Sequence, residues 1–149
     1  MQMVGKSKMA KLLSVAAAAV SIAVQTAGPA AAADDGHLIK TDPSPCGGQE
    51  FVDYGPGAAG GGDNDDYFLI HDYCSDGHGV KAWAWQNGTY LGGKYNGNGL
   101  NGAAVVWDPF INGNVAPGDA VGMKVCLVDG DSDPTPFDCK SYTFTSQDG

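Results

Sequence analysis

Residues 80–95 read VKAWAWQNGTYLGGKY, and this stretch decides the fold. Asn87-Gly88 near its centre tolerates the positive φ angles that a two-residue β-hairpin turn requires. Segments with the residue types and length of short strands lie on both sides of this dipeptide. The stretch therefore predicts two antiparallel strands joined by a tight turn.

Other short strands are expected before and after this hairpin, separated by turns rich in Gly, Asn and Pro. No window after residue 33 carries a helical period or a capping box before an apolar run. We therefore predict an all-β fold, an antiparallel β-sandwich of six or seven short strands. Seven candidate strands span residues 49–54, 66–74, 80–86, 89–95, 103–107, 120–128 and 140–146. Residues 34–45 read as a loose lead-in, in which 37–40 could form a further short strand.

The first 33 residues have the parts of a secretory signal peptide. Three lysines precede an uncharged apolar run at 12–24, and small residues at 31–33 suit a cleavage site. The apolar run of about 13 residues is shorter than the roughly 20 residues that span a bilayer. We predict a cleavable signal over 1–33 and one secreted domain over 34–149.

The predicted mature domain is strongly acidic. It contains all 17 acidic residues, five of the eight lysines and no arginine, so its formal charge is 5 − 17 = −12. A field of this sign repels nucleic acids and anionic membranes. We therefore expect neither as a partner, and predict a monomer that meets an extracellular carbohydrate or protein.

Four cysteines, Cys46, Cys74, Cys126 and Cys139, follow the signal. An even number in an exported domain predicts two disulfides, and three pairings are open. Alternation along 120–128 places valine, methionine and leucine on the core face and Cys126 on the opposite face. This favours Cys126–Cys139 across a hairpin, and Cys46–Cys74 then follows by elimination.

Three stretches of the domain are similar to parts of a known group. Cys74-Ser-Asp-Gly-His-Gly-Val-Lys-Ala-Trp-Ala-Trp85, Ala-Pro-Gly-Asp119 and Val125-Cys-Leu-Val-Asp-Gly130 resemble small exported β-sandwich proteins of actinomycete bacteria. The likeness covers residues 67–145. The resemblance implies an immunoglobulin-like fold and secretion from the cell. Most members of that group have no assigned function, so the resemblance transfers no site residues.

Aromatic side chains form the main candidate binding site. Trp83 and Trp85 are two residues apart on one strand and therefore face the same way, while the alternate positions are alanines that suit a core. Tyr90 and Tyr95 lie on the partner strand. Flat rings on a sheet suit stacking against sugar rings or burial by a protein partner. The alternative is that one tryptophan belongs to the core.

The segment Asp129-Gly-Asp131-Ser-Asp133 has the alternating oxygen spacing of a calcium loop. It departs from the EF-hand pattern at Pro134, where that motif has glycine, and at Lys140, where it has a bidentate acid. The sequence therefore predicts at most a weak calcium site at Asp129, Asp131 and Asp133, and no other cofactor. The alternative is a solvated acidic loop.

The residues give little support to catalysis. A histidine beside an acid, as in His71-Asp72, could orient a general base, but no G-x-S-x-G nucleophile motif is present. We expect a non-enzymatic binding module. The alternatives are a protease inhibitor that presents the loop between Cys126 and Cys139, stiffened by Pro134 and Pro136, and a small hydrolase.

Overall fold

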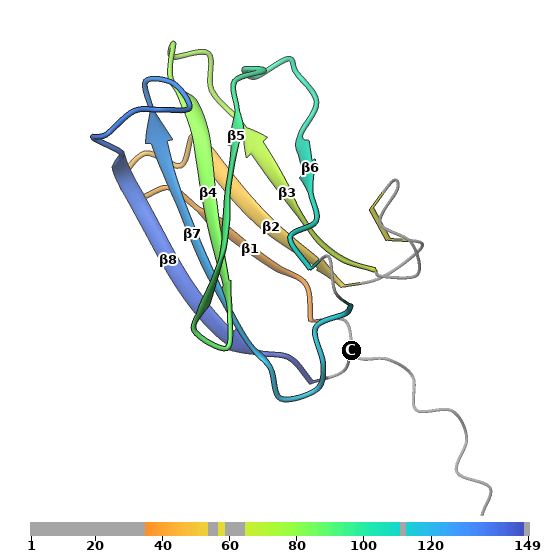
Figure 1. The fold of residues 1–149 in the computed structure, drawn as a ribbon. Coiled ribbons are helices and arrows are strands. Elements are labelled where there is room, and N and C mark those ends of the chain that lie inside the picture. The colour runs from red at the N-terminus through yellow and green to blue at the C-terminus, as the bar shows by residue number, and fades with distance from the viewer. Residues whose placement is uncertain (1–34, 54–56, 59–64, 111–112, 148–149) are drawn as a thin grey trace, which may run out of the picture. The chain divides into compact units, whose positions relative to one another are not determined.

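The computed structural model describes residues 35–53, 57–58, 65–110 and 113–147. The expected signal over 1–33 and most of the glycine-rich stretch 55–62 lie outside these residues. The described part is all-β, and Figure 1 shows its eight strands, which is one or two more than expected. No helix long and apolar enough to cross a membrane occurs in these ranges.

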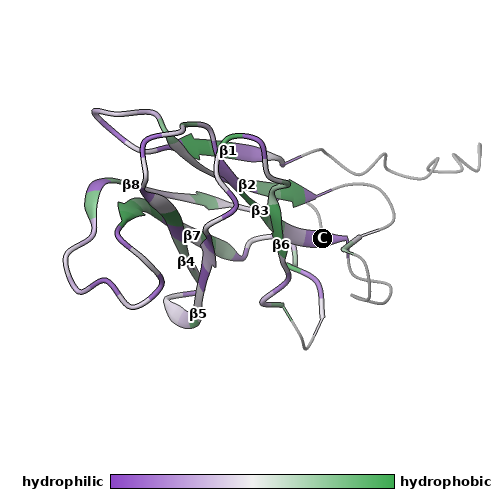
Figure 2. Ribbon diagram, turned by 90° about the horizontal axis from the view of Figure 1, so that it is seen from above, coloured by the Kyte–Doolittle hydropathy of each residue, from purple (hydrophilic) through white to green (hydrophobic). Residues whose placement is uncertain are grey.

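The strands form two antiparallel sheets of four. Sheet A has the order β1–β2–β3–β6, and sheet B has the order β5–β4–β7–β8. Viewed from above, the sheets lie as two layers, which makes the fold the predicted β-sandwich (Figure 2). The strands are β1 His37–Lys40, β2 Gly47–Asp53, β3 Asp66–Asp72, β4 Gly79–Gln86, β5 Thr89–Asn96, β6 Val105–Trp107, β7 Ala120–Val128 and β8 Phe137–Thr145.

Small and large side chains complement one another in the core. Ala82 and Ala84 of β4 are fully buried in one cluster with phenylalanine rings. The ring of Phe51 on β2 lies 5.5 Å from that of Phe68 and 5.1 Å from that of Phe144, between centroids. Such aromatic pairs stabilise by about 0.5–1.5 kcal/mol beyond the area they bury. Bulky side chains at both alanine positions would compete with these rings for space.

The β4–β5 turn is the one that the sequence predicts. Asn87 and Gly88 have φ angles of 50° and 79°, as a two-residue turn with two positive φ angles requires. Asp119, in the loop before β7, holds the turn from outside. Its carboxylate accepts hydrogen bonds from Gln86 Nε2 at 2.8 Å and Asn87 Nδ2 at 2.7 Å, and from the backbone N–H of Ala116 at 3.0 Å.

Both predicted disulfides are present, Cys46–Cys74 and Cys126–Cys139. Cys126 is opposite Lys81 in the register, on the outer face of sheet B, as the alternation argument requires. Strand β8 begins at Phe137, three residues earlier than expected. A register shift between β7 and β8 and a positive φ of 50° at Asp138 absorb this extra length.

Two buried amides connect the sheets. Gln49 on β2 donates from Nε2 to the carbonyl of Trp83 on β4 at 3.2 Å. Asn96 at the end of β5 donates from Nδ2 to the carbonyl of Ile70 on β3 at 2.7 Å. Because a buried polar group is costly unless it is bonded, these contacts favour one alignment of the two layers.

We predict that replacing both Cys126 and Cys139 by alanine lowers the free energy of unfolding by about 3 kcal/mol. The disulfide closes a loop of about 14 residues, which restricts the unfolded chain. Urea unfolding of oxidised wild type and variant measures the difference. An unchanged free energy of unfolding would show that the loop is already restricted without the disulfide.

We predict that Asp119→Ala lowers stability at neutral pH by about 1 kcal/mol, since it removes hydrogen bonds near solvent. The side chain of Asn87, then the N–H of Ala116 and the side chain of Gln86, lower the pKa of Asp119 from 3.8. A lowered folded-state pKa means that this stability is present above pH 3.8 and is lost as the pH falls through the folded-state value.

Thermal unfolding of wild type and Asp119→Ala at neutral pH and well below pH 3.8 tests this. The gap in Tm should close in acid. Asp42→Ala is a suitable control, because the Asp42 side chain forms an exposed ion pair with Lys140 at 3.6 Å and the backbone bond from Asp42 to Asp138 is kept in the variant. A gap that persists at low pH would mean that packing, not the carboxylate, stabilises the turn.

Candidate functional site

The outer face of sheet B carries the aromatic residues that the sequence singles out. Trp83 and Trp85 lie on this face and are partly exposed, while the alternate residues Ala82 and Ala84 point inward and are fully buried. The tryptophan that packs against the core is Trp107 on β6. Sheet B therefore presents two indole rings on its outer surface.

Lysines flank Trp83. The ammonium group of Lys81 lies 5.9 Å from the ring centroid of Trp83, and that of Lys124, on β7, lies 5.2 Å from it. Lys81 also forms an ion pair with the Asp131 carboxylate at 2.9 Å and donates to the Asp131 carbonyl. Trp83 is therefore already in cation–π contact, which leaves Trp85 as the more available ring.

A pocket of about 250 Å³ opens beside Trp85, and we call it the Trp85 pocket. One of its lining residues is Gly122 on β7, which is opposite Trp85 on one side and Thr143 on the other. Since Gly122 has no side chain, it leaves a hollow between them; a Cβ there would lie 3.3 Å from the Trp85 Cβ. The hydroxyl residues Ser141 and Thr143 also line the pocket, together with Gly88, Ala120 and Met123.

Tyr90 extends the aromatic surface at this end of the sheet. It follows the hairpin turn on β5 and is opposite Trp85 in the register. The two ring centroids are 5.6 Å apart, and Tyr90 is 56% exposed. Trp85 and Tyr90 together can cover a flat apolar ligand surface larger than one indole ring.

Tyr95 does not join this group. It lies over Gly79 and Gly97, where an added Cβ would come within 2.5 Å and 2.7 Å of its ring atoms. It lines a different pocket of about 340 Å³ among the loops at the end of the sandwich where β3, β5 and β7 finish (Figure 1). There the ring of His78 binds Asp129, with Nδ1 2.6 Å from Oδ1.

The three aspartates of the predicted calcium loop have different partners. Asp129 binds the histidine just described, and Asp131 binds Lys81. Asp133 accepts from the backbone N–H of Asp129, then from the N–H and hydroxyl of Thr135, and these bonds lower its pKa. The geometry therefore does not direct the three carboxylates toward a common ion.

Carboxylates do converge at the start of β3. Asp53, Asp65 and Asp66 each offer an oxygen within 4.8 Å of the others, a spacing that could hold a divalent cation. Asp66 also accepts the backbone N–H of Val115 at 2.5 Å. The sequence indicates an acidic cluster here through Asp63, Asp65 and Asp66, of which Asp63 lies outside the described residues. The contribution of Asp53 depends on the pairing of β2 with β3.

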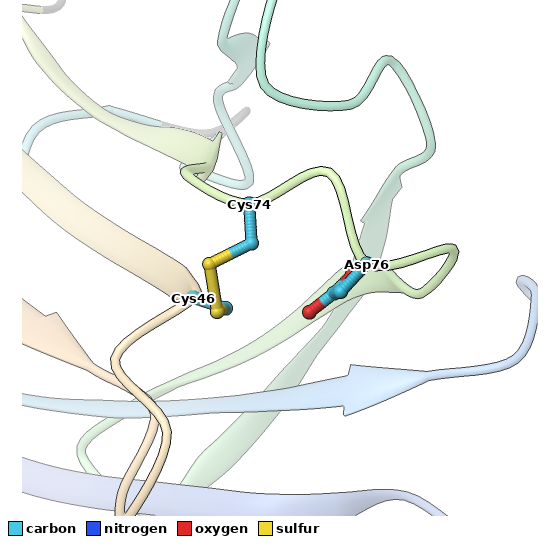
Figure 3. A group of neighbouring side chains, drawn as sticks. All are labelled: Cys46, Cys74 and Asp76. Atoms are coloured by element: carbon cyan, nitrogen blue, oxygen red, sulfur yellow. A yellow bond between two sulfur atoms is a disulfide. The ribbon is translucent and has the colours of Figure 1, made fainter.

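Cys46, Cys74 and Asp76 form another close group, shown in Figure 3. The two sulfurs are joined in the disulfide, so neither is the thiolate that a metal ion requires. Asp76 instead accepts the backbone N–H of His78 at 3.0 Å. This group therefore holds two loops together.

His71 and Asp72 do not act as a pair, because consecutive residues of a strand point to opposite faces. The Nε2 of His71 is 2.8 Å from Glu50 Oε2, and its ring stacks on Tyr73 with centroids 5.3 Å apart. Asp72 is buried and accepts the N–H of Cys74 at 3.2 Å; burial raises its pKa. The geometry thus gives no support to a His71–Asp72 base.

Sequence reasoning missed the other lining residues of the Trp85 pocket, among them Gly122, Ser141 and Thr143. A glycine inside a strand pattern often marks a bend or a close approach, and Gly122 is such a glycine. Its position opposite Trp85 becomes clear only from the strand register. The chain matches no protein-family model, no curated protein and no solved structure.

Proposed function

We propose that this protein is an exported, non-enzymatic module that binds an extracellular carbohydrate at the Trp85 pocket. One observation carries the proposal: a partly exposed indole ring lies beside a hollow whose lining includes the hydroxyl residues Ser141 and Thr143. An apolar wall with a few polar groups is the usual composition of a small-molecule site.

A sugar ring suits this chemistry. Its C–H face is apolar and can stack on an indole, while the hydroxyls at its rim can exchange hydrogen bonds with Ser141 and Thr143. The volume of about 250 Å³ lies just below the 300–1,000 Å³ that is typical of drug-sized ligands. We infer that one sugar unit enters the pocket and that neighbouring units lie on Tyr90.

Other features support binding without catalysis, outside the cell. The residues that line the Trp85 pocket include no histidine or carboxylate that could act as a general base. Two disulfides fit an oxidising compartment, in agreement with the signal-like residues 1–33. The negative net charge argues against nucleic acid and anionic membranes as partners, and we take the module to act as a monomer.

The strand order also supports an immunoglobulin-like topology. The sheet β5–β4–β7–β8 corresponds to strands C′, C, F and G of such domains, and β2–β3–β6 corresponds to A, B and E. The protein departs from the antibody pattern in two respects. Its disulfides do not join β3 to β7, and the tryptophans of β4 point outward.

A second candidate is a protease inhibitor, favoured by the stiffness of the loop 129–136. The Cys126–Cys139 disulfide closes this loop, and Asp133 accepts three hydrogen bonds within it. A loop held in one conformation loses little entropy on binding a protease. The carbohydrate proposal is preferred because the Trp85 pocket has a shape and a lining that select a ligand.

We predict that Trp85→Ala reduces binding of neutral oligosaccharides about tenfold or more, which corresponds to a loss of about 1.4 kcal/mol. Gly122→Val should have a similar effect, because its side chain fills the hollow. Isothermal titration calorimetry against a panel of neutral glucan, galactan, mannan and xylan oligosaccharides measures both.

Val106→Thr is the matched control, since Val106 is 47% exposed on sheet A and far from the pocket in the strand order. It should bind as wild type does. Thermal unfolding of all variants confirms that they are folded. The proposal fails if the wild type binds none of the panel, or if Trp85→Ala binds as tightly as wild type.

For the inhibitor candidate, we expect inhibition of an extracellular serine protease to disappear when Cys126 and Cys139 are replaced by alanine. Trp85→Ala should leave any such inhibition intact. Residual activity of a panel of secreted proteases, with intact and variant protein, measures this. Absence of inhibition by the intact protein removes the candidate.

A further inference from the structure

Positive charge is concentrated on the strands of sheet B. These strands contain four of the five lysines that follow residue 33, and Asp138 is their single acidic residue. Nearly all other carboxylates of this acidic chain therefore belong to sheet A or to the loops. The strands of sheet B are therefore basic, although the protein as a whole is acidic.

Two of these lysines, Lys81 and Lys124, lie on the outer face beside Trp83. Asp131 neutralises Lys81 at 2.9 Å. In the ranges 35–53, 57–58, 65–110 and 113–147, no carboxylate lies within ion-pair distance of Lys124. The one aromatic ring that its ammonium group contacts in these ranges is that of Trp83. Lys124 is therefore the uncompensated positive charge of this face.

Lys124 is also next to the Trp85 pocket. It lies two residues along β7 from Gly122, a spacing of about 7 Å. In the register it is opposite Ser141, which lines that pocket. A lysine side chain is long enough to cover this spacing, and an exposed cation–π contact is weak compared with a charge-assisted bond to a bound anion.

We propose that the carbohydrate held at the Trp85 pocket is acidic, and that Lys124 binds its anionic group. The inference rests on the proposed function and specifies its ligand class: a sugar unit stacks on Trp85 while a carboxylate or sulfate, on the same unit or the next, pairs with the Lys124 ammonium group. The flexible, point-charge ammonium of lysine suits either anion.

The negative net charge of the protein does not oppose this contact. Exposed charges interact over a Debye length of about 8 Å at physiological salt. An anion in contact with Lys124 is well inside that distance, whereas the loop carboxylates bind partners of their own, as Asp129 and Asp119 do. A dense polyanion such as nucleic acid would extend beyond this small area and meet the acidic surroundings.

The test compares matched pairs of ligands that differ only in charge. Trigalacturonate is titrated against its methyl ester, and a sulfated galactan oligosaccharide against its desulfated form, by calorimetry with wild type, Lys124→Met and Lys94→Met. We expect wild type to bind at least one charged form about tenfold more tightly than its neutral partner. Lys124→Met should abolish this preference and leave the binding of the neutral forms unchanged.

Lys94→Met is the control because Lys94 is an exposed lysine of the same sheet whose register partner is the inward-facing Ala82; it should keep the preference. Lys124→Arg should restore it. A preference for the uronate assigns a carboxylate, and a preference for the sulfated oligosaccharide assigns a sulfate ester.

The inference is overturned if charged and neutral forms bind wild type equally, if Lys124→Met keeps the preference, or if none of the four probes binds. Neutral oligosaccharides that bind in a Trp85-dependent manner without any charge preference would leave the proposed function standing. The two ideas therefore fail on different measurements.

Discussion

Side-chain alternation along β4 is the constraint on which both the core and the candidate site depend. The inward positions are Val80 and two alanines, which leave room for the phenylalanine rings of the opposite sheet. The outward positions are Lys81, Trp83 and Trp85. A shift of one residue in register would place two indoles in the core and two alanines on the surface. The alternation along β4 therefore places small residues in the core and the candidate binding residues on the outer face. The hydrogen bond from Gln49 to the Trp83 carbonyl helps to hold β4 in this position.

Much of the fold follows from local signals in the sequence. Asn87-Gly88 identifies the hairpin because few other dipeptides accept two positive φ angles. Alternation along 120–128 places Cys126 on the outer face, which favours Cys139 as its partner, and this disulfide is present. The early start of β8 could not be predicted, since it depends on a bulge that forms only when β7 and β8 pair.

The candidate site is less predictable from the sequence, because it too depends on how the strands pair. A single strand shows that Trp83 and Trp85 share a face, and the structure agrees. The hollow at Gly122 can be predicted only when the register of three neighbouring strands is known. Tyr95 lies away from the tryptophans because Gly79 and Gly97 leave space for its ring elsewhere. Contacts between residues distant in sequence decide which aromatic rings act together, and no local period encodes them.

The unusual choice of acid also has a structural explanation. Of the 17 acidic residues only Glu50 is a glutamate, although both acids would serve solubility equally. Aspartate is short enough for its carboxylate to bond to the backbone N–H two residues later, which fixes a turn without a helix or a large core. This bond occurs at Asp72, Asp76, Asp108 and Asp133. The carboxylates thus gather in the loops because they hold turns there, and the strands of sheet B, which need no such bonds, are left to carry the lysines.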